Sequence, residues 1–126
     1  MCNCLYCYRP LLKGEKDMHT ACVKKFFGTT TLPVLDYTIG QLDQLALQII
    51  QDQTSLTGVQ PKLSLHLKEH EGSKRLTIVG LWGGYICKPQ TSQYEMMPEV
   101  EDLTMHLAEA ARIEVVPHTL MRICLL

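Results

Sequence analysis

The chain has 126 residues, of which 12 are Lys or Arg and 13 are Asp or Glu, so its net charge is close to zero. This balance argues against a general nucleic-acid or membrane-surface binder, and no apolar stretch approaches the roughly 20 residues that span a bilayer. The first residues lack the basic segment and long apolar run of a secretion signal. We therefore expect a cytoplasmic protein whose thiols stay reduced.

The predicted elements begin with a compact, Cys-rich segment over residues 1–28, which ends in a short helix. An extended linker over residues 29–37 follows. Apolar residues at three- and four-residue spacing then predict a helix over residues 39–53. Thr38 and Gln41 form a capping-box pattern at its start.

Three strands are predicted next, over residues 63–67, 75–82 and 83–89, and the short turns between them predict an antiparallel meander. A second long helix is predicted over residues 98–112. Its apolar stripe consists of Val100, Leu103, Leu107, Ala110 and Ala111. Extended segments close the chain. The predicted fold class is α+β, an antiparallel sheet with two helices over residues 38–126, preceded by the small Cys/His segment.

Four residues near the start of the chain are candidate metal ligands, paired as C-x2-C and H-x2-C: Cys4, Cys7, His19 and Cys22. A two-residue gap lets a tight turn aim two ligands at one ion, and thiolate and imidazole are ligands that Zn²⁺ prefers. A segment this short has little apolar surface for a core, so a structural zinc ion is the favoured interpretation. The alternative is a set of free thiols with a surface His. A redox C-x-x-C fits less well, because no strand precedes it. Cys2 is either a further candidate or a bystander.

The stretch "TSLTGVQPKLSL", residues 54–65, is a turn that carries hydroxyl groups and leads into a strand. Gly58 would allow the backbone to approach a ligand, and Lys62 could supply a positive charge. In isolation such a stretch is more typical of a solvated turn.

Two charged residues change that interpretation, because a strand Lys and a helix Glu hold the ATP phosphates in kinases. Lys88 stands at the end of the third predicted strand, and Glu101 stands in the first turns of the next helix. Taken singly, Lys88 is typical of a solubilising charge on an edge strand, and Glu101 of a favourable partner of the helix dipole.

In the stretches "TSLTGVQPKLSL", "GGYICKPQ" and "MMPEVEDLTMHLAEAARIEVVPHTLM" the sequence resembles the HipA family of serine/threonine kinases, the toxins of bacterial toxin–antitoxin pairs. The resemblance covers roughly residues 38–122, and it looks closest to the short HipT-like branch. It implies that Ser55 and Thr57 are autophosphorylation candidates. It also implies a set of nucleotide-binding residues: Gly58, Gln60 and Lys62 in a phosphate-covering loop, Lys88 on the ATP phosphates, and Glu101 orienting that lysine.

The resemblance further implies a catalytic Asp, a metal-binding Asp and a C-terminal lobe that are not among these residues. We therefore expect an N-terminal kinase lobe that is inactive alone and binds ATP weakly or not at all without the C-lobe. Expected partners are a separately encoded C-lobe, a helix-turn-helix antitoxin, or a second copy through exposed apolar surface, with no membrane and no direct nucleic acid. The alternative is a non-enzymatic, zinc-stapled module that binds such a partner protein. A small DNA-binding zinc protein is disfavoured by the charge balance.

Overall fold

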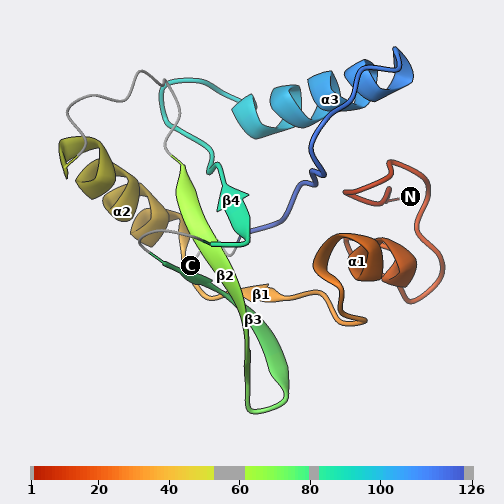
Figure 1. Ribbon diagram of the computed structural model, residues 1–126, viewed down its shortest axis with the longest axis horizontal. Helices are drawn as coiled ribbons and strands as arrows, with labels where there is room; N and C mark the ends of the chain where they lie inside the picture. The colour runs from red at the N-terminus through yellow and green to blue at the C-terminus, as the bar shows by residue number, and fades with distance from the viewer. Residues whose placement is uncertain (1, 53–61, 80–82, 124–126) are drawn as a thin grey trace. The chain divides into compact units, whose positions relative to one another are not determined.

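The computed structural model describes residues 2–52, 62–79 and 83–123. These residues form three helices and a four-stranded sheet, which confirms the predicted α+β class (Figure 1). Within these ranges, every helix is too short or too polar to cross a membrane.

Contacts divide the chain into two compact units, and each is described by itself. One unit joins residues 1–32 to residues 96–122, and residues 33–95 make up most of the other. The first unit therefore unites two segments that are far apart in the sequence. The sequence predicted three consecutive segments, residues 1–28, 29–37 and 38–126. This division stays a prediction, because units defined by contacts need not be consecutive in the sequence.

The sheet belongs to the second unit and has the strand order β1-β3-β2-β4. Its strands are β1 (Val34–Leu35), β2 (Leu63–His70), β3 (Ser73–Ile78) and β4 (Tyr85–Cys87). β2 and β3 form an antiparallel hairpin (Figure 1). Its two-residue turn has positive φ at Glu71 and Gly72, as tight hairpin turns require.

The predicted meander is wrong in two respects. β4 pairs antiparallel with β2 rather than with β3, and β1, which the sequence placed in an extended linker, pairs parallel with β3. The two corrections have one cause. Because β1 occupies the outer edge of β3, the free edge left for β4 is that of β2. The sheet is therefore mixed, not purely antiparallel.

Gly83 allows the chain to enter β4 past β2. A Cβ atom at this position would collide with the backbone of Leu65 and the side chain of Ser64. The Gly83 N–H instead donates a hydrogen bond of 2.8 Å to Ser64 Oγ. The absence of a side chain is what brings the two strands into register at this point.

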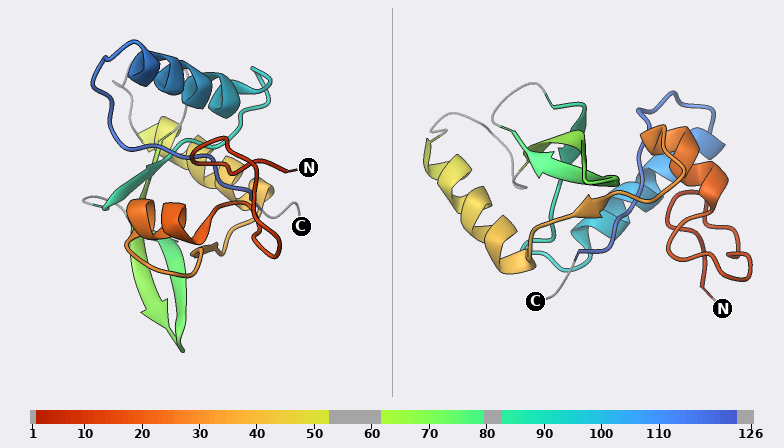
Figure 2. Two further views of the ribbon diagram at one scale, coloured as in Figure 1. Left: turned by 90° about the vertical axis from the view of Figure 1, so that its right-hand side faces the viewer. Right: turned by 90° about the horizontal axis from the view of Figure 1, so that it is seen from below.

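The three helices of the described residues lie where the sequence predicted them. α1 (Thr20–Phe27) ends at Gly28, whose φ of 72° is the left-handed cap conformation, and it buries Val23 and Phe27. α2 (Ile39–Asp52) lies beside the sheet (Figure 2) and begins with the predicted capping box. The Gln41 N–H donates to Thr38 Oγ1 at 3.2 Å, and the Thr38 N–H donates to Gln41 Oε1 at 2.9 Å. Buried leucines from α2 and the strands form the core of this unit: Leu35, Leu42, Leu63, Leu65 and Leu76.

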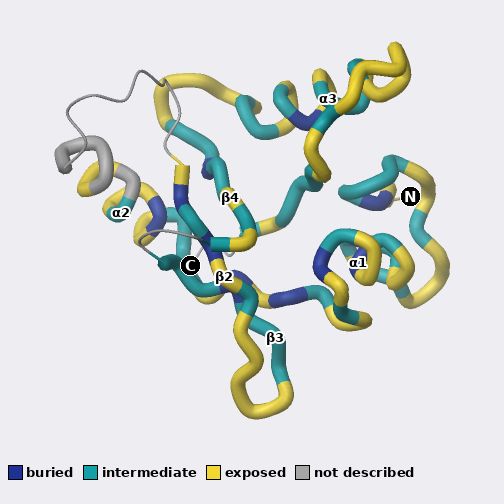
Figure 3. The backbone as a smooth tube through the Cα atoms, viewed as in Figure 1, coloured by how far each residue is buried: buried dark blue, intermediate teal, exposed yellow. Residues whose placement is uncertain are grey.

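α3 (Met97–Ala110) belongs to the first unit and corrects a second prediction. The predicted apolar stripe is exposed, since Val100, Leu103 and Leu107 are 59%, 49% and 61% accessible. Figure 3 shows α3 as a helix of mainly exposed and intermediate residues. The buried residue of this helix is instead Asp102. The helix therefore packs through its polar face. Tyr8 and His118 form hydrogen bonds with the Asp102 carboxylate on that face.

The segment after α3 turns back and runs beside the N-terminal segment (Figure 2). The Leu120 N–H donates to the Leu5 carbonyl oxygen at 3.4 Å, and the Arg122 guanidinium lies 2.9 Å from the Asp17 carboxylate. The described residues from 113 to 123 form no helix or strand, so the extended segments predicted there add no strand to the sheet within this range.

Replacing Leu42 by Ala should lower the free energy of unfolding by about 2–5 kcal/mol, because the removed atoms leave a cavity in the core of the second unit. Leu42 is 1% exposed, whereas Leu47 on the same helix is 60% exposed. Leu47→Ala is therefore the matched control and should change the stability by less than about 0.5 kcal/mol. Urea denaturation measures both, and equal losses at the two positions would contradict this packing of α2.

Candidate functional site: a Cys/His cluster and a buried polar network

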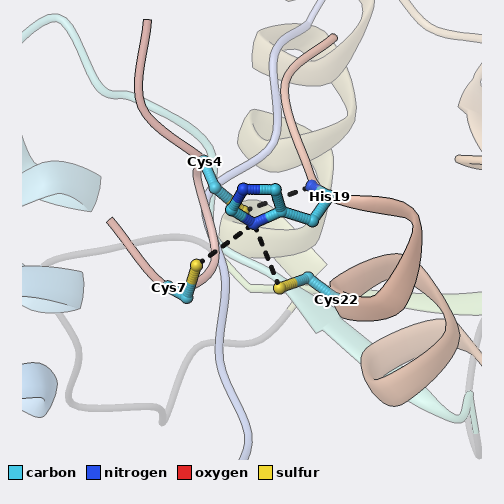
Figure 4. A group of neighbouring side chains, drawn as sticks. All are labelled: Cys4, Cys7, His19 and Cys22. Carbon is cyan, nitrogen blue, oxygen red and sulfur yellow. Dashed lines mark hydrogen bonds between the residues drawn. The ribbon is translucent and has the colours of Figure 1, made fainter. Parts of the chain in front are cut away.

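The four predicted metal ligands converge in the first unit (Figure 4). Cys4 and Cys7 come from the N-terminal turn, and His19 and Cys22 come from the start of α1. Their candidate ligand atoms all lie within 4.8 Å of one another. The sequence therefore identified a cluster that folding brings together.

The spacing within the cluster fits zinc. His19 Nδ1 lies 3.3 Å from Cys7 Sγ and 3.7 Å from Cys22 Sγ. A tetrahedral site with a Zn–S bond of about 2.3 Å and a Zn–N bond of about 2.0–2.1 Å separates sulfur from nitrogen by about 3.6 Å. The two observed distances bracket that value.

The surroundings of His19 prepare its Nδ1 for a ligand. Its Nε2 lies 2.9 Å from the Pro10 carbonyl oxygen, so the ring donates its proton there. Nδ1 then carries the lone pair and faces the thiols. The His19 backbone N–H donates to Cys4 Sγ at 3.4 Å, which stabilises negative charge on that sulfur.

The thiols differ in how readily they ionise. Burial opposes ionisation of Cys4, but hydrogen bonds from the backbone of Cys7, His19 and Tyr6 outweigh it and lower the pKa of Cys4 to about 7. Burial and the neighbouring sulfurs of Cys7 and Cys4 raise the pKa of Cys22 to about 12. Cys4 therefore ionises readily, whereas ionisation of Cys22 beside the other sulfurs is unfavourable. A divalent cation would favour that ionisation, because it neutralises the repulsion between thiolates.

A second polar cluster in the same unit was not predicted. Tyr8 Oη donates a hydrogen bond of 2.5 Å to Asp102 Oδ2, and His118 Nδ1 lies 2.7 Å from Asp102 Oδ1. His106, one turn along α3 from Asp102, packs against Tyr8 with ring centroids 4.1 Å apart and ring planes tilted by 41°. Burial and the adjacent Asp102 carboxylate raise the pKa of Tyr8, so the phenol keeps the proton that it donates.

The sequence held one signal for this cluster. Asp102 and His106 are four residues apart on a predicted helix and must share a face. That signal is easily missed, because a carboxylate in the first turns of a helix is already explained by the helix dipole. The positions of Tyr8 and His118, far away in the sequence, could not be inferred from spacing.

Three of the predicted nucleotide-binding residues lie in the described part of the chain. Lys62 is exposed and immediately precedes β2, Lys88 is half-buried and immediately follows β4, and Glu101 is half-buried on α3. Lys88 and Glu101 belong to different units, so their pairing stays a prediction. The remaining predicted residues lie outside the described residues: Ser55, Thr57, Gly58 and Gln60.

The fold and the cluster define a small α+β protein with a Cys/His metal-ligand set. The family model of the HipA-like C-terminal domain matches residues 54–124, which is more than half of the chain. The chain therefore belongs to the HipA family, as its sequence motifs predicted. A search of curated proteins gave no match. The matched model describes a C-terminal domain, so the narrower assignments to an N-terminal lobe and to the HipT-like branch stay predictions.

Replacing Tyr8 by Phe should destabilise the first unit by about 1–3 kcal/mol. The Asp102 carboxylate would lose a hydrogen-bond donor while remaining buried away from water. Tyr94→Phe is the control, since Tyr94 is 53% exposed and belongs to the other unit. Thermal unfolding of the two variants provides the comparison. An unchanged midpoint for Tyr8→Phe would show that the Tyr8–Asp102 bond contributes nothing to stability.

Proposed function

We propose that this chain supplies the ATP-phosphate-binding part of a HipA-like serine/threonine kinase. The observation that carries the proposal is the family match over residues 54–124, because this range contains every residue assigned above to phosphate binding. The activity that we propose for these residues is nucleotide binding and not phosphotransfer.

The local structure around two of these residues supports the proposal. Lys88 is held by the end of β4, and the second turn of α3 carries Glu101. Both side chains are half-buried, where water screens charges less than it does on the open surface. In the proposed site, Lys88 binds the phosphates and Glu101 orients its ammonium group.

The stretch of sequence over residues 54–62, which precedes β2, would complete the proposed site. Gly58, Gln60 and Lys62 would cover the phosphates, and phosphorylation of Ser55 or Thr57 would add about −1.5 to −2 charges beside them. That added charge would repel an anionic nucleotide. Autophosphorylation of the loop would therefore weaken nucleotide binding.

ATP should raise the unfolding temperature of the wild-type chain, and the shift should disappear in Lys88→Ala. Ligand that is ten times above its Kd stabilises a protein by about 1.4 kcal/mol, so millimolar ATP reveals even weak binding. Lys68→Ala is the matched control, because Lys68 is an exposed lysine of β2 outside the proposed site. A shift that persists in Lys88→Ala, or that is absent from the wild type, would reject the proposed phosphate site.

A second candidate function is a zinc-stapled interaction module, and the observation that favours it is the convergence of Cys4, Cys7, His19 and Cys22. In this proposal the ion holds the N-terminal segment in place and the unit binds a partner protein. The candidate partners are a kinase C-lobe, a helix-turn-helix antitoxin or a second copy of the chain. The exposed apolar side chains of α3 would suit any of these protein surfaces.

Cys22→Ser should abolish stoichiometric zinc binding at the cluster, because it removes one of four ligands from a site that needs a closed tetrahedron. Cys2→Ser is the matched control, since Cys2 is exposed and outside the cluster. Competition with a chromogenic zinc chelator measures how much zinc each variant retains. Equal zinc retention by the two variants would exclude the four-residue site.

A further inference from the structure

We propose that Asp102, His106 and His118 form a second divalent-metal site in the first unit, separate from the Cys/His cluster and suited to Zn²⁺. Their candidate ligand atoms lie within 4.8 Å of one another. Two imidazole nitrogens and one carboxylate oxygen form a ligand set that binds Zn²⁺ and leaves a coordination position open. The proposal does not depend on the assignment of zinc to the Cys/His cluster.

The first argument comes from His106. Its Nε2 lies 3.5 Å from Asp102 Oδ2. A tetrahedral zinc site separates its nitrogen and oxygen ligands by about 3.4 Å, so this pair already has the spacing of two ligands on one ion. Nε2 is also buried and lacks a hydrogen-bond partner among the described residues. A buried polar atom without a partner is unfavourable, and a metal ion would satisfy it.

The second argument comes from Glu109, which faces the far side of both imidazoles. Its Oε2 lies 3.8 Å from His106 Nδ1, and its Oε1 lies 3.5 Å from His118 Nε2. A carboxylate in this position favours a proton on the outer nitrogen of each ring once a cation binds the inner nitrogen. The inner nitrogens, His106 Nε2 and His118 Nδ1, can then present lone pairs to an ion beside Asp102.

The third argument is that the site is held in place before any ion binds. Helix geometry puts Asp102 and His106 on one face of α3, and Tyr8 donates a hydrogen bond to Asp102 Oδ2. Asp102 is 4% exposed, so a charged carboxylate is kept in a position with little water. A cation would gain more from such a carboxylate than from one on the open surface.

His118 has to adjust when the ion enters. Its Nδ1 lies 2.7 Å from Asp102 Oδ1, which is the distance of a hydrogen bond and is shorter than the spacing of two metal ligands. Nδ1 must give up the hydrogen that it donates, and Nε2 then carries the ring proton towards Glu109. In the absence of metal, the same residues form a network in which His106 Nε2 has no hydrogen-bond partner among the described residues.

That difference defines the experiment. The full chain is dialysed against Zn²⁺ and the bound metal is counted by elemental analysis, for the wild type, His106→Gln and His66→Gln. His66 is an exposed histidine of β2 and controls for adventitious binding to imidazole. We expect two ions per wild-type chain, two per His66→Gln chain and one per His106→Gln chain. A His106→Gln chain that keeps the wild-type number of ions would overturn the proposal.

Titration of the wild type with Co²⁺ separates the two sites. Cobalt at the Cys/His cluster gives a thiolate charge-transfer band, whereas cobalt at Asp102, His106 and His118 gives visible bands without it. A single equivalent with the thiolate band would overturn the proposal. If the wild type binds one equivalent of Co²⁺ without the thiolate band, and His106→Gln does not bind it, the proposed second site is supported. That result would reject metal binding at the Cys/His cluster. If His106→Gln loses its circular-dichroism signal, the wild-type titration decides alone.

Discussion

The first unit depends on the hydrogen bond from Tyr8 to Asp102. A carboxylate with almost no contact with water is stable only where donors replace its hydration. Tyr8 supplies one donor from the N-terminal segment, and His118 supplies another from the segment after α3. The buried Asp102 carboxylate therefore connects α3 to the N-terminal segment and to the segment that follows α3. It also explains why α3 turns a polar residue inward and leaves its apolar side chains exposed.

This arrangement couples the Cys/His cluster to α3. Tyr8 directly follows Cys7, so an ion that fixes Cys7 also fixes the residue that holds Asp102. The N-terminal segment therefore affects the position of α3 through bonded neighbours and a single hydrogen bond.

Local patterns predicted the local features well. The end of α1 at residue 28, the capping box at Thr38 and the start of α3 near residue 98 follow from residues a few positions apart, and all are present. The Cys and His spacing likewise predicted a cluster that forms. Strand order and the buried face of α3 could not be predicted, because both depend on distant partners. β1 is two residues long, which is too short to show any periodicity, yet it decides which edge β4 joins.

The long-range nature of the Tyr8–Asp102 bond has a consequence for biosynthesis. Its two residues are 94 positions apart, whereas the β2–β3 hairpin closes within a few residues. At roughly 5–20 residues per second, the ribosome needs about 5–20 s to proceed from one to the other. During that interval the cysteines of the N-terminal turn have emerged but lack the helix that will anchor them. An early-arriving metal ion would protect these thiols from oxidation while the rest of the unit is still being made.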